Sequence, residues 1–129
     1  MRNDLHEQAE KLFLQACAEL KINTMLPDVS FLPSRNQKAI LAFYKLSVII
    51  QCVNEDWLPD WQDEERVAYC PWFSAVAGAR ACLSFSDTAF AASKTLAHFG
   101  SRFCYKRPGL AKEWGQKLLP LYEDILLLN

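Results

Sequence analysis

The sequence has few of the residues from which catalytic sites are usually built. Its 129 residues include only four glycines and two histidines. The glycines are scattered, so the chain has neither a glycine-rich phosphate loop nor a glycine-framed nucleophile. His6 and His98 are too far apart in sequence to form a metal-binding pair on one helix face. These absences predict no catalytic residue, no metal and no cofactor, and they favour a protein that is not an enzyme.

The chain also lacks a large charge of either sign and a long apolar run. A net charge of -1 and an isoelectric point near 6.1 disfavour a general nucleic-acid coat. The longest apolar run, residues 46–53, is far shorter than the roughly 20 residues of a spanning helix. Residues 1–10 are acidic where a signal peptide would be basic and then apolar. We therefore expect a cytoplasmic protein that does not cross a membrane.

The five cysteines are odd in number and widely spaced, which predicts reduced thiols. Two alternatives would give these cysteines a chemical role. A nucleophilic pair of His98 with Cys104 or Cys82 has no supporting local signature. A zinc site made of Cys70, Cys82, His98 and Cys104 is disfavoured because structural zinc ligands usually come in pairs two to four residues apart.

The length fits one domain, residues 1–129. Apolar residues at three- and four-residue steps predict a helix over 4–20. Ser34 and Gln37 have the spacing of a capping box before a nearly all-apolar helix that reaches residue 53. The connector between them, residues 21–33, contains Leu26, Val29, Phe31 and Leu32 and is therefore predicted to lie across the core.

The second half has the pattern of strands followed by a helix. Short β-like runs predict antiparallel strands over 66–73, 80–86 and 101–106, and residues 87–97 fit a strand, a loop or a helix equally well. Pro108 is suited to the first turn of a last helix, and Pro120 should kink or interrupt that helix. The predicted fold is α+β, with two N-terminal helices, a three-stranded antiparallel sheet and a C-terminal helix (α-α-β-β-β-α).

An acidic segment, residues 54–65, carries six carboxylates and no lysine or arginine. Calcium binding is disfavoured because apolar residues interrupt the oxygen ligands and no glycine allows the turn of an EF-hand. The two remaining interpretations are a solvated loop pinned by its tryptophans and a partner-binding surface. The candidate partner-binding residues are Asp56, Trp57, Asp60, Trp61 and Asp63.

A basic segment, residues 94–117, has six lysines and arginines against one glutamate, so the molecule is electrically polar. In the predicted third strand, basic side chains alternate with aromatic ones, and the aromatic face is expected to be core. An open face of the sheet would give a groove for single-stranded RNA or DNA, or for a protein partner. The candidate residues of this basic face are Arg102, Lys106, Arg107, Lys112 and Trp72.

Several short motifs occur in a fixed order from residue 26 to the C-terminus. They are Leu26-Pro27-Asp28-Val29-Ser30, Tyr44-Lys45-Leu46, Trp57 with Pro59-Asp60-Trp61, Tyr69 with Pro71-Trp72-Phe73, Gly100-Ser101-Arg102 with Cys104, and Leu110-Ala111 with Gly115 and Leu121-Tyr122. This pattern resembles an uncharacterised family of small proteins from Bacteroidales chromosomes, prophages and mobile elements. The chain departs from the family pattern over residues 75–97 and at Pro120. The resemblance implies a bacterial or phage cytoplasm but no activity or functional residue.

Two functions are consistent with these features. The first is a non-catalytic binding protein of phage or mobile-element origin, which acts on a host protein or ribonucleoprotein and could inhibit a host defence system such as CRISPR. The alternative is an accessory protein that binds single-stranded RNA or DNA through the basic face.

Overall fold

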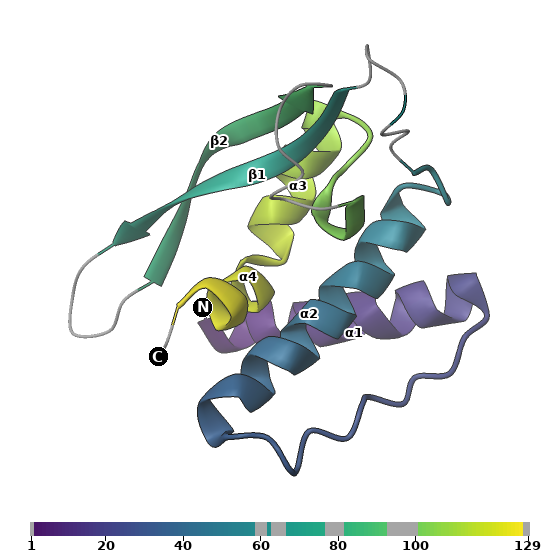
Figure 1. Ribbon diagram of the computed structural model, residues 1–129, viewed down its shortest axis with the longest axis vertical. Helices are drawn as coiled ribbons and strands as arrows, with labels where there is room; N and C mark the ends of the chain where they lie inside the picture. Colours follow the sequence, from purple (N-terminus) through teal and green to yellow (C-terminus); the bar gives the residue numbers. More distant parts are fainter. Residues whose placement is uncertain (1, 59–61, 63–66, 77–81, 93–100, 128–129) are drawn as a thin grey trace.

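The computed structural model describes residues 2–58, 62, 67–76, 82–92 and 101–127 (Figure 1). These residues form four α-helices, a β-hairpin and one short 3-10 helix. In chain order they are α1 (Arg2–Leu20), α2 (Ser34–Val53), β1 (Val67–Val76), β2 (Cys82–Ala92), η1 (Ser101–Phe103), α3 (Pro108–Lys117) and α4 (Leu119–Leu126).

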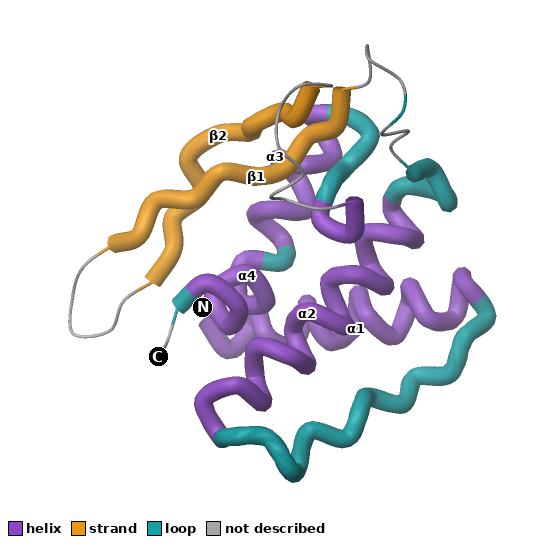
Figure 2. The backbone as a smooth tube through the Cα atoms, in the orientation of Figure 1, coloured by secondary structure: helices purple, strands orange, loops and turns teal. Residues whose placement is uncertain are grey.

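The predicted α+β fold with a three-stranded sheet is wrong, because the described part of the chain is mainly helical (Figure 2). The two N-terminal helices are found near their predicted positions. The only sheet among the described residues is the pairing of β1 with β2. The single predicted C-terminal helix is two helices, α3 and α4.

The core lies where α1, α2 and α4 meet. Helix α1 buries Ala9, Phe13, Ala16 and Cys17, whose spacing places them on one face. Helix α2 buries residues on several sides, as its nearly all-apolar sequence predicts. The two helices are also joined at the surface by an ion pair between Lys45 Nζ and Glu10 Oε2 at 2.8 Å.

Strands β1 and β2 pair antiparallel from Val67↔Ala92 to Val76↔Cys82, with a register shift between Trp72 and Phe73. Both strands pack against α3, and the hairpin forms a layer on the opposite side of the molecule from the α1–α2 connector (Figure 1). Strand β2 continues through Ala92, so most of the segment that the sequence left open, residues 87–97, is strand. The rest of that segment lies outside the described residues.

The predicted third strand is replaced by η1 and one isolated bridge. Tyr105 exchanges both main-chain hydrogen bonds with Tyr69, at 2.7 and 3.0 Å. On its other edge, the side-chain amide of Asn54 donates to the Cys104 carbonyl at 2.8 Å and accepts from the Lys106 N–H at 3.1 Å. The buried Asn54 amide therefore forms the two main-chain hydrogen bonds that a neighbouring strand would have formed on this edge. Helix α3 begins three residues after Tyr105, so the segment has no length left for a ladder.

Pro120 interrupts the C-terminal helix as predicted. Helix α3 ends at Lys117, and Pro120 lies buried in the first turn of α4, where its missing N–H removes no helical hydrogen bond. The capping box predicted at Ser34 is not formed. Ser34 is already helical, the N-cap is Pro33, and Gln37 Nε2 donates instead to the Leu32 carbonyl at 3.0 Å.

Candidate functional site

The structure describes only part of the acidic segment. Asp56 is exposed and has a positive φ of 65°, in the turn that follows α2. Trp57 is half-buried beside it. The other three candidate residues, Asp60, Trp61 and Asp63, lie outside the described residues. The solvated-loop and partner-binding interpretations therefore both stay predictions.

The basic candidates are distributed over three elements and not along one strand. Arg102 is exposed in η1, Arg107 and Lys112 are exposed at the start of α3, and Trp72 is exposed on β1. The predicted alternation of basic and aromatic faces is wrong, because Cys104 and Tyr105 are consecutive and both buried. Arg102, Arg107 and Lys112 make no ion pair with the described part of the chain.

The start of the acidic segment contacts the middle of the basic segment. Lys106 is half-buried, and its Nζ lies 3.8 Å from Glu55 Oε2, next to the Asn54 hydrogen bonds to the same segment. Because Glu55 is largely exposed, this ion pair contributes at most about 1 kcal/mol. Lys106 thus takes part in joining α2 to the Tyr105 segment, while the other basic candidates stay open to solvent.

The described cysteines are poorly suited to nucleophilic chemistry. Cys17, Cys52, Cys70 and Cys104 are free thiols. Burial, followed by the hydrogen bond from the thiol to the Glu19 carboxylate, raises the pKa of Cys52 to about 12. Burial also raises the pKa of Cys70 to about 12 and that of Cys17 above its usual value. A reactive cysteine needs the opposite shift, because the thiolate is the nucleophile.

The His98–cysteine pair and the zinc site that includes His98 both depend on a residue outside the described part of the chain. His98 is not among the described residues, and nothing is described of the side chain of Cys82. Within the described residues, no group of three or more His, Cys, Asp or Glu side chains is placed to hold a metal ion. None of the described helices is long and apolar enough to cross a membrane.

The most exposed apolar surface is the connector between α1 and α2, residues 21–33. Its prediction as a core segment is wrong: it follows the outside of the molecule (Figure 1), and only Val29 and Leu32 are half-buried. Phe31 is 79 % exposed and Met25 is 73 % exposed. Four of the ten large apolar side chains that are exposed in the described residues belong to this connector: Ile22, Met25, Leu26 and Phe31. Such a concentration of apolar surface is typical of an interaction site.

The connector leaves α1 in a fixed direction. Lys21 has a φ of 58°, its N–H bonds to the Ala18 carbonyl, and the Ile22 N–H bonds to the Cys17 carbonyl. This is a Schellman motif, which ends a helix and turns the chain away from its axis. The far end is held by the bond from Gln37 to Leu32.

Between these ends, two side chains of the connector accept hydrogen bonds from its own main-chain N–H groups. Asn23 Oδ1 accepts from the Met25 N–H at 2.7 Å, and Asp28 Oδ1 accepts from the Ser30 N–H at 3.0 Å. The main-chain and side-chain hydrogen bonds from Ser30 lower the pKa of the Asp28 carboxyl. These two Asx turns are the sequence signal that could have identified a surface segment, since Asn and Asp two residues before a bonded N–H are typical of loops.

Comparisons with models of protein families, with curated proteins and with solved structures gave no match. The functional argument therefore rests on the residues described above.

Proposed function

We propose that this protein is a non-catalytic binding protein whose α1–α2 connector inserts apolar side chains into a groove of a partner protein. The partner would be a host protein or ribonucleoprotein in the bacterial cytoplasm, and the protein would be of phage or mobile-element origin. An inhibitor of a host defence system such as CRISPR would be one protein of this kind.

The exposure of Met25 and Phe31 on the connector is the observation that carries the proposal. Burying a large apolar side chain gives about 1.5–3 kcal/mol, so these two residues together can supply much of the affinity of an interface. Both ends of the connector are already fixed, which lowers the entropy lost when it binds.

Charge favours an apolar partner groove over an ionic one at this surface. Lys21 and Asp28 are the only charged residues of the connector, and they have opposite signs. The exposed Arg102, Arg107 and Lys112 belong to other elements and would act in the approach of an acidic partner more than in the final contact.

The test begins with affinity capture of the tagged full chain from lysate of the bacterium that encodes it, with and without nuclease, followed by mass spectrometry. Binding is then measured with the purified partner, for the wild type and for the double variant Met25→Ser/Phe31→Ser. We expect the double variant to bind at least about tenfold more weakly with its helix content unchanged, because both positions are exposed in the free protein.

Leu58→Ser is the matched control. Leu58 is 75 % exposed, about as much as Met25, but it belongs to the acidic segment and not to the connector. Its substitution should change the partner affinity less than about twofold. A partner that binds the double variant as tightly as the wild type would refute the role of the connector, and a loss confined to Leu58→Ser would point to the acidic segment instead.

The alternative, binding of single-stranded RNA or DNA, makes a different prediction for the same experiment. Capture would then be lost on nuclease treatment, and affinity for an oligonucleotide would fall steeply with salt, because phosphate contacts release counterions. Arg102→Ala/Arg107→Ala would weaken that binding, whereas Met25→Ser/Phe31→Ser would not. No arrangement among the described residues favours this alternative over the first.

A further inference from the structure

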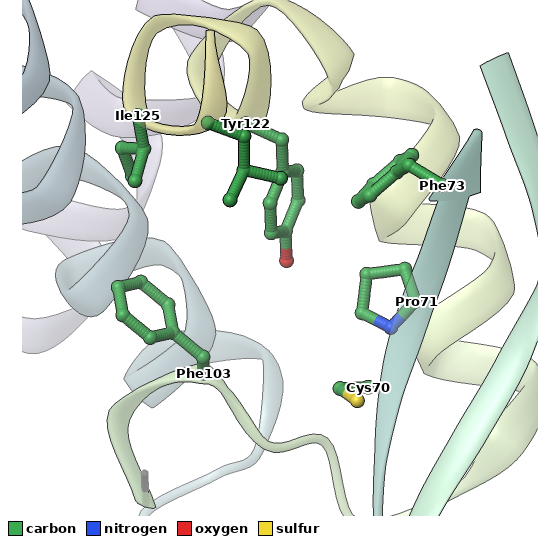
Figure 3. Close-up of a pocket in the computed structure, with 7 residues that line it drawn as sticks. Cys70, Pro71, Phe73, Phe103, Tyr122 and Ile125 are labelled. Carbon is green, nitrogen blue, oxygen red and sulfur yellow. The ribbon is translucent and has the colours of Figure 1, made fainter. Parts of the chain in front are cut away.

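A pocket of about 250 Å³ lies between β1, η1 and α4, and no residue of the connector lines it. Figure 3 shows the side chains that line it. Strand β1 contributes Cys70, Pro71 and Phe73, η1 contributes Phe103, and α4 contributes Tyr122, Ile125 and Leu126. None of these side chains is charged at neutral pH. Figure 3 shows the Tyr122 ring extending from α4 into the space between Phe73, Pro71 and Phe103.

The Tyr122 hydroxyl at this pocket does not use all of its capacity for hydrogen bonding. Tyr122 is only 7 % exposed, and its hydroxyl lies 2.8 Å from the hydroxyl of the fully buried Tyr105. One hydroxyl donates to the other, so the second hydrogen of the pair needs a different acceptor. Within the described residues, neither tyrosine hydroxyl has another hydrogen-bond partner. Buried polar groups normally have a hydrogen-bond partner, so a hydroxyl hydrogen without an acceptor beside an apolar pocket indicates that the pocket suits a ligand with an acceptor oxygen.

The volume and the walls of the pocket limit the kind of ligand that can carry the acceptor oxygen. An engineered apolar cavity of about 150 Å³ holds benzene, and sites for drug-sized ligands begin at about 300 Å³. A volume of about 250 Å³ therefore suits one substituted ring. The rings of Phe73 and Tyr122, with centroids 4.9 Å apart, and the ring of Phe103 provide aromatic walls.

We propose that this pocket binds an uncharged, mainly apolar molecule of about one substituted ring, whose single carbonyl-type oxygen accepts a hydrogen bond from the Tyr105–Tyr122 pair. Burial raises the pKa of both tyrosines, so their hydroxyls keep the proton to be donated at neutral pH. A carboxylate ligand would lose its hydration among these side chains without gaining a positive partner, and so it is excluded. The proposal is independent of the connector.

The test compares three probes of similar size, acetophenone, ethylbenzene and benzoate, by titration followed through the amide and methyl NMR signals of the full chain. Acetophenone has the ring and the acceptor, ethylbenzene lacks the acceptor, and benzoate is charged. We expect acetophenone to bind about fivefold or more tightly than ethylbenzene, the worth of one hydrogen bond, and benzoate to show no binding at the pocket. Equal affinities for acetophenone and ethylbenzene, or no binding of either, would overturn the proposal.

Two variants locate the binding. Tyr122→Phe should lower acetophenone affinity to that of ethylbenzene and leave ethylbenzene unchanged, while Tyr44→Phe, a half-buried tyrosine outside the pocket, should change neither. Leu126→Trp is the second variant, chosen because Leu126 is exposed at the rim and a larger residue there is compatible with folding. It should weaken acetophenone binding at least tenfold by filling the pocket. Acetophenone binding that survives Leu126→Trp would place the probe elsewhere and refute the site.

Discussion

Asn54 connects two parts of the chain that are 50 residues apart in sequence. Its buried amide bonds to the Cys104 carbonyl and the Lys106 N–H, directly beyond the C-terminus of α2. We predict that Asn54→Ala lowers the free energy of unfolding by about 2 kcal/mol, because two main-chain groups lose their partner away from water. Asn54→Asp keeps the acceptor but loses the donor, and it should also destabilise. Denaturation by urea gives both values.

Asn23 provides the control for this prediction. Its side chain also bonds to a main-chain N–H, that of Met25, but the site is exposed. Asn23→Ala should therefore cost no more than about 0.5 kcal/mol. If Asn54→Ala were equally mild, the side chain of Asn54 could not be what replaces the missing strand.

The third strand shows where residue patterns stop being informative. Residues 101–106 have the composition of a strand, and Tyr105 does form a bridge with Tyr69. The segment is limited to a single bridge because α3 begins at Pro108. Its other edge is bonded by Asn54, and no local pattern can identify a partner 50 residues away. Signals within one segment, by contrast, were sufficient to predict three helices: the apolar periodicity of α1, the nearly all-apolar run of α2 and Pro108 in the first turn of α3.

At the scale of elements, both N-terminal helices end in the same way. Lys21 and Glu55 occupy the left-handed position of a Schellman motif, with φ of 58° and 53°, where glycine is usual. We predict that Lys21→Gly raises the free energy of unfolding by about 0.5–1 kcal/mol, because it removes the steric cost of this conformation. Thermal or urea unfolding would measure the gain.

Lys21→Ala separates this effect from the loss of the lysine side chain. Alanine keeps the Cβ that crowds the left-handed conformation, so this variant should gain nothing. A Lys21→Gly protein less stable than Lys21→Ala would contradict the role of backbone strain at the end of α1.

The exposure of the connector could not be predicted from its composition. Leu26 and Phe31 are residues that normally lie inside a protein, but burial requires an apolar face that is still free. Helix α1 packs its apolar face on α2 and α4, which fills the core without the connector. The acidic and basic candidates could be found from the sequence because charge is visible residue by residue. The pocket lined by Tyr122 depends on contacts between β1, η1 and α4, which no local pattern reveals.

At the scale of the whole molecule, the two proposed surfaces are separate. The connector joins α1 to α2, and the pocket lies between β1 and α4 on the other side (Figure 1). We predict that Leu126→Trp leaves partner binding unchanged and that Met25→Ser/Phe31→Ser leaves acetophenone affinity unchanged, each within about twofold. A change of more than tenfold in either cross-test would show that the two sites are coupled.

Buried thiols and phenols make the stability of the molecule sensitive to alkaline pH. In the unfolded chain the thiols of Cys52 and Cys70 ionise near pH 9, whereas in the folded protein their pKa is about 12. Between these pH values the folded state binds more protons than the unfolded state, so the free energy of unfolding must fall as the pH rises. Burial also raises the pKa of Tyr105 and Tyr122, which adds to the same trend. The contribution of these thiols and phenols to stability should therefore be constant up to about pH 8.5, and stability should decline steadily above pH 9.

Urea unfolding at a series of pH values measures this decline, and Cys52→Ala/Cys70→Ala identifies its source. The double variant loses two of the groups whose pKa differs between the folded and unfolded states, so its stability should fall less steeply between pH 9 and 11 even if it is lower at pH 7. Tyr105→Phe tests the phenol contribution in the same way. If the wild type kept its full stability to pH 11, Cys70 and Tyr122 could not be enclosed as the packing of β1 and α4 places them, and the pocket that these two residues line would have to be open to water.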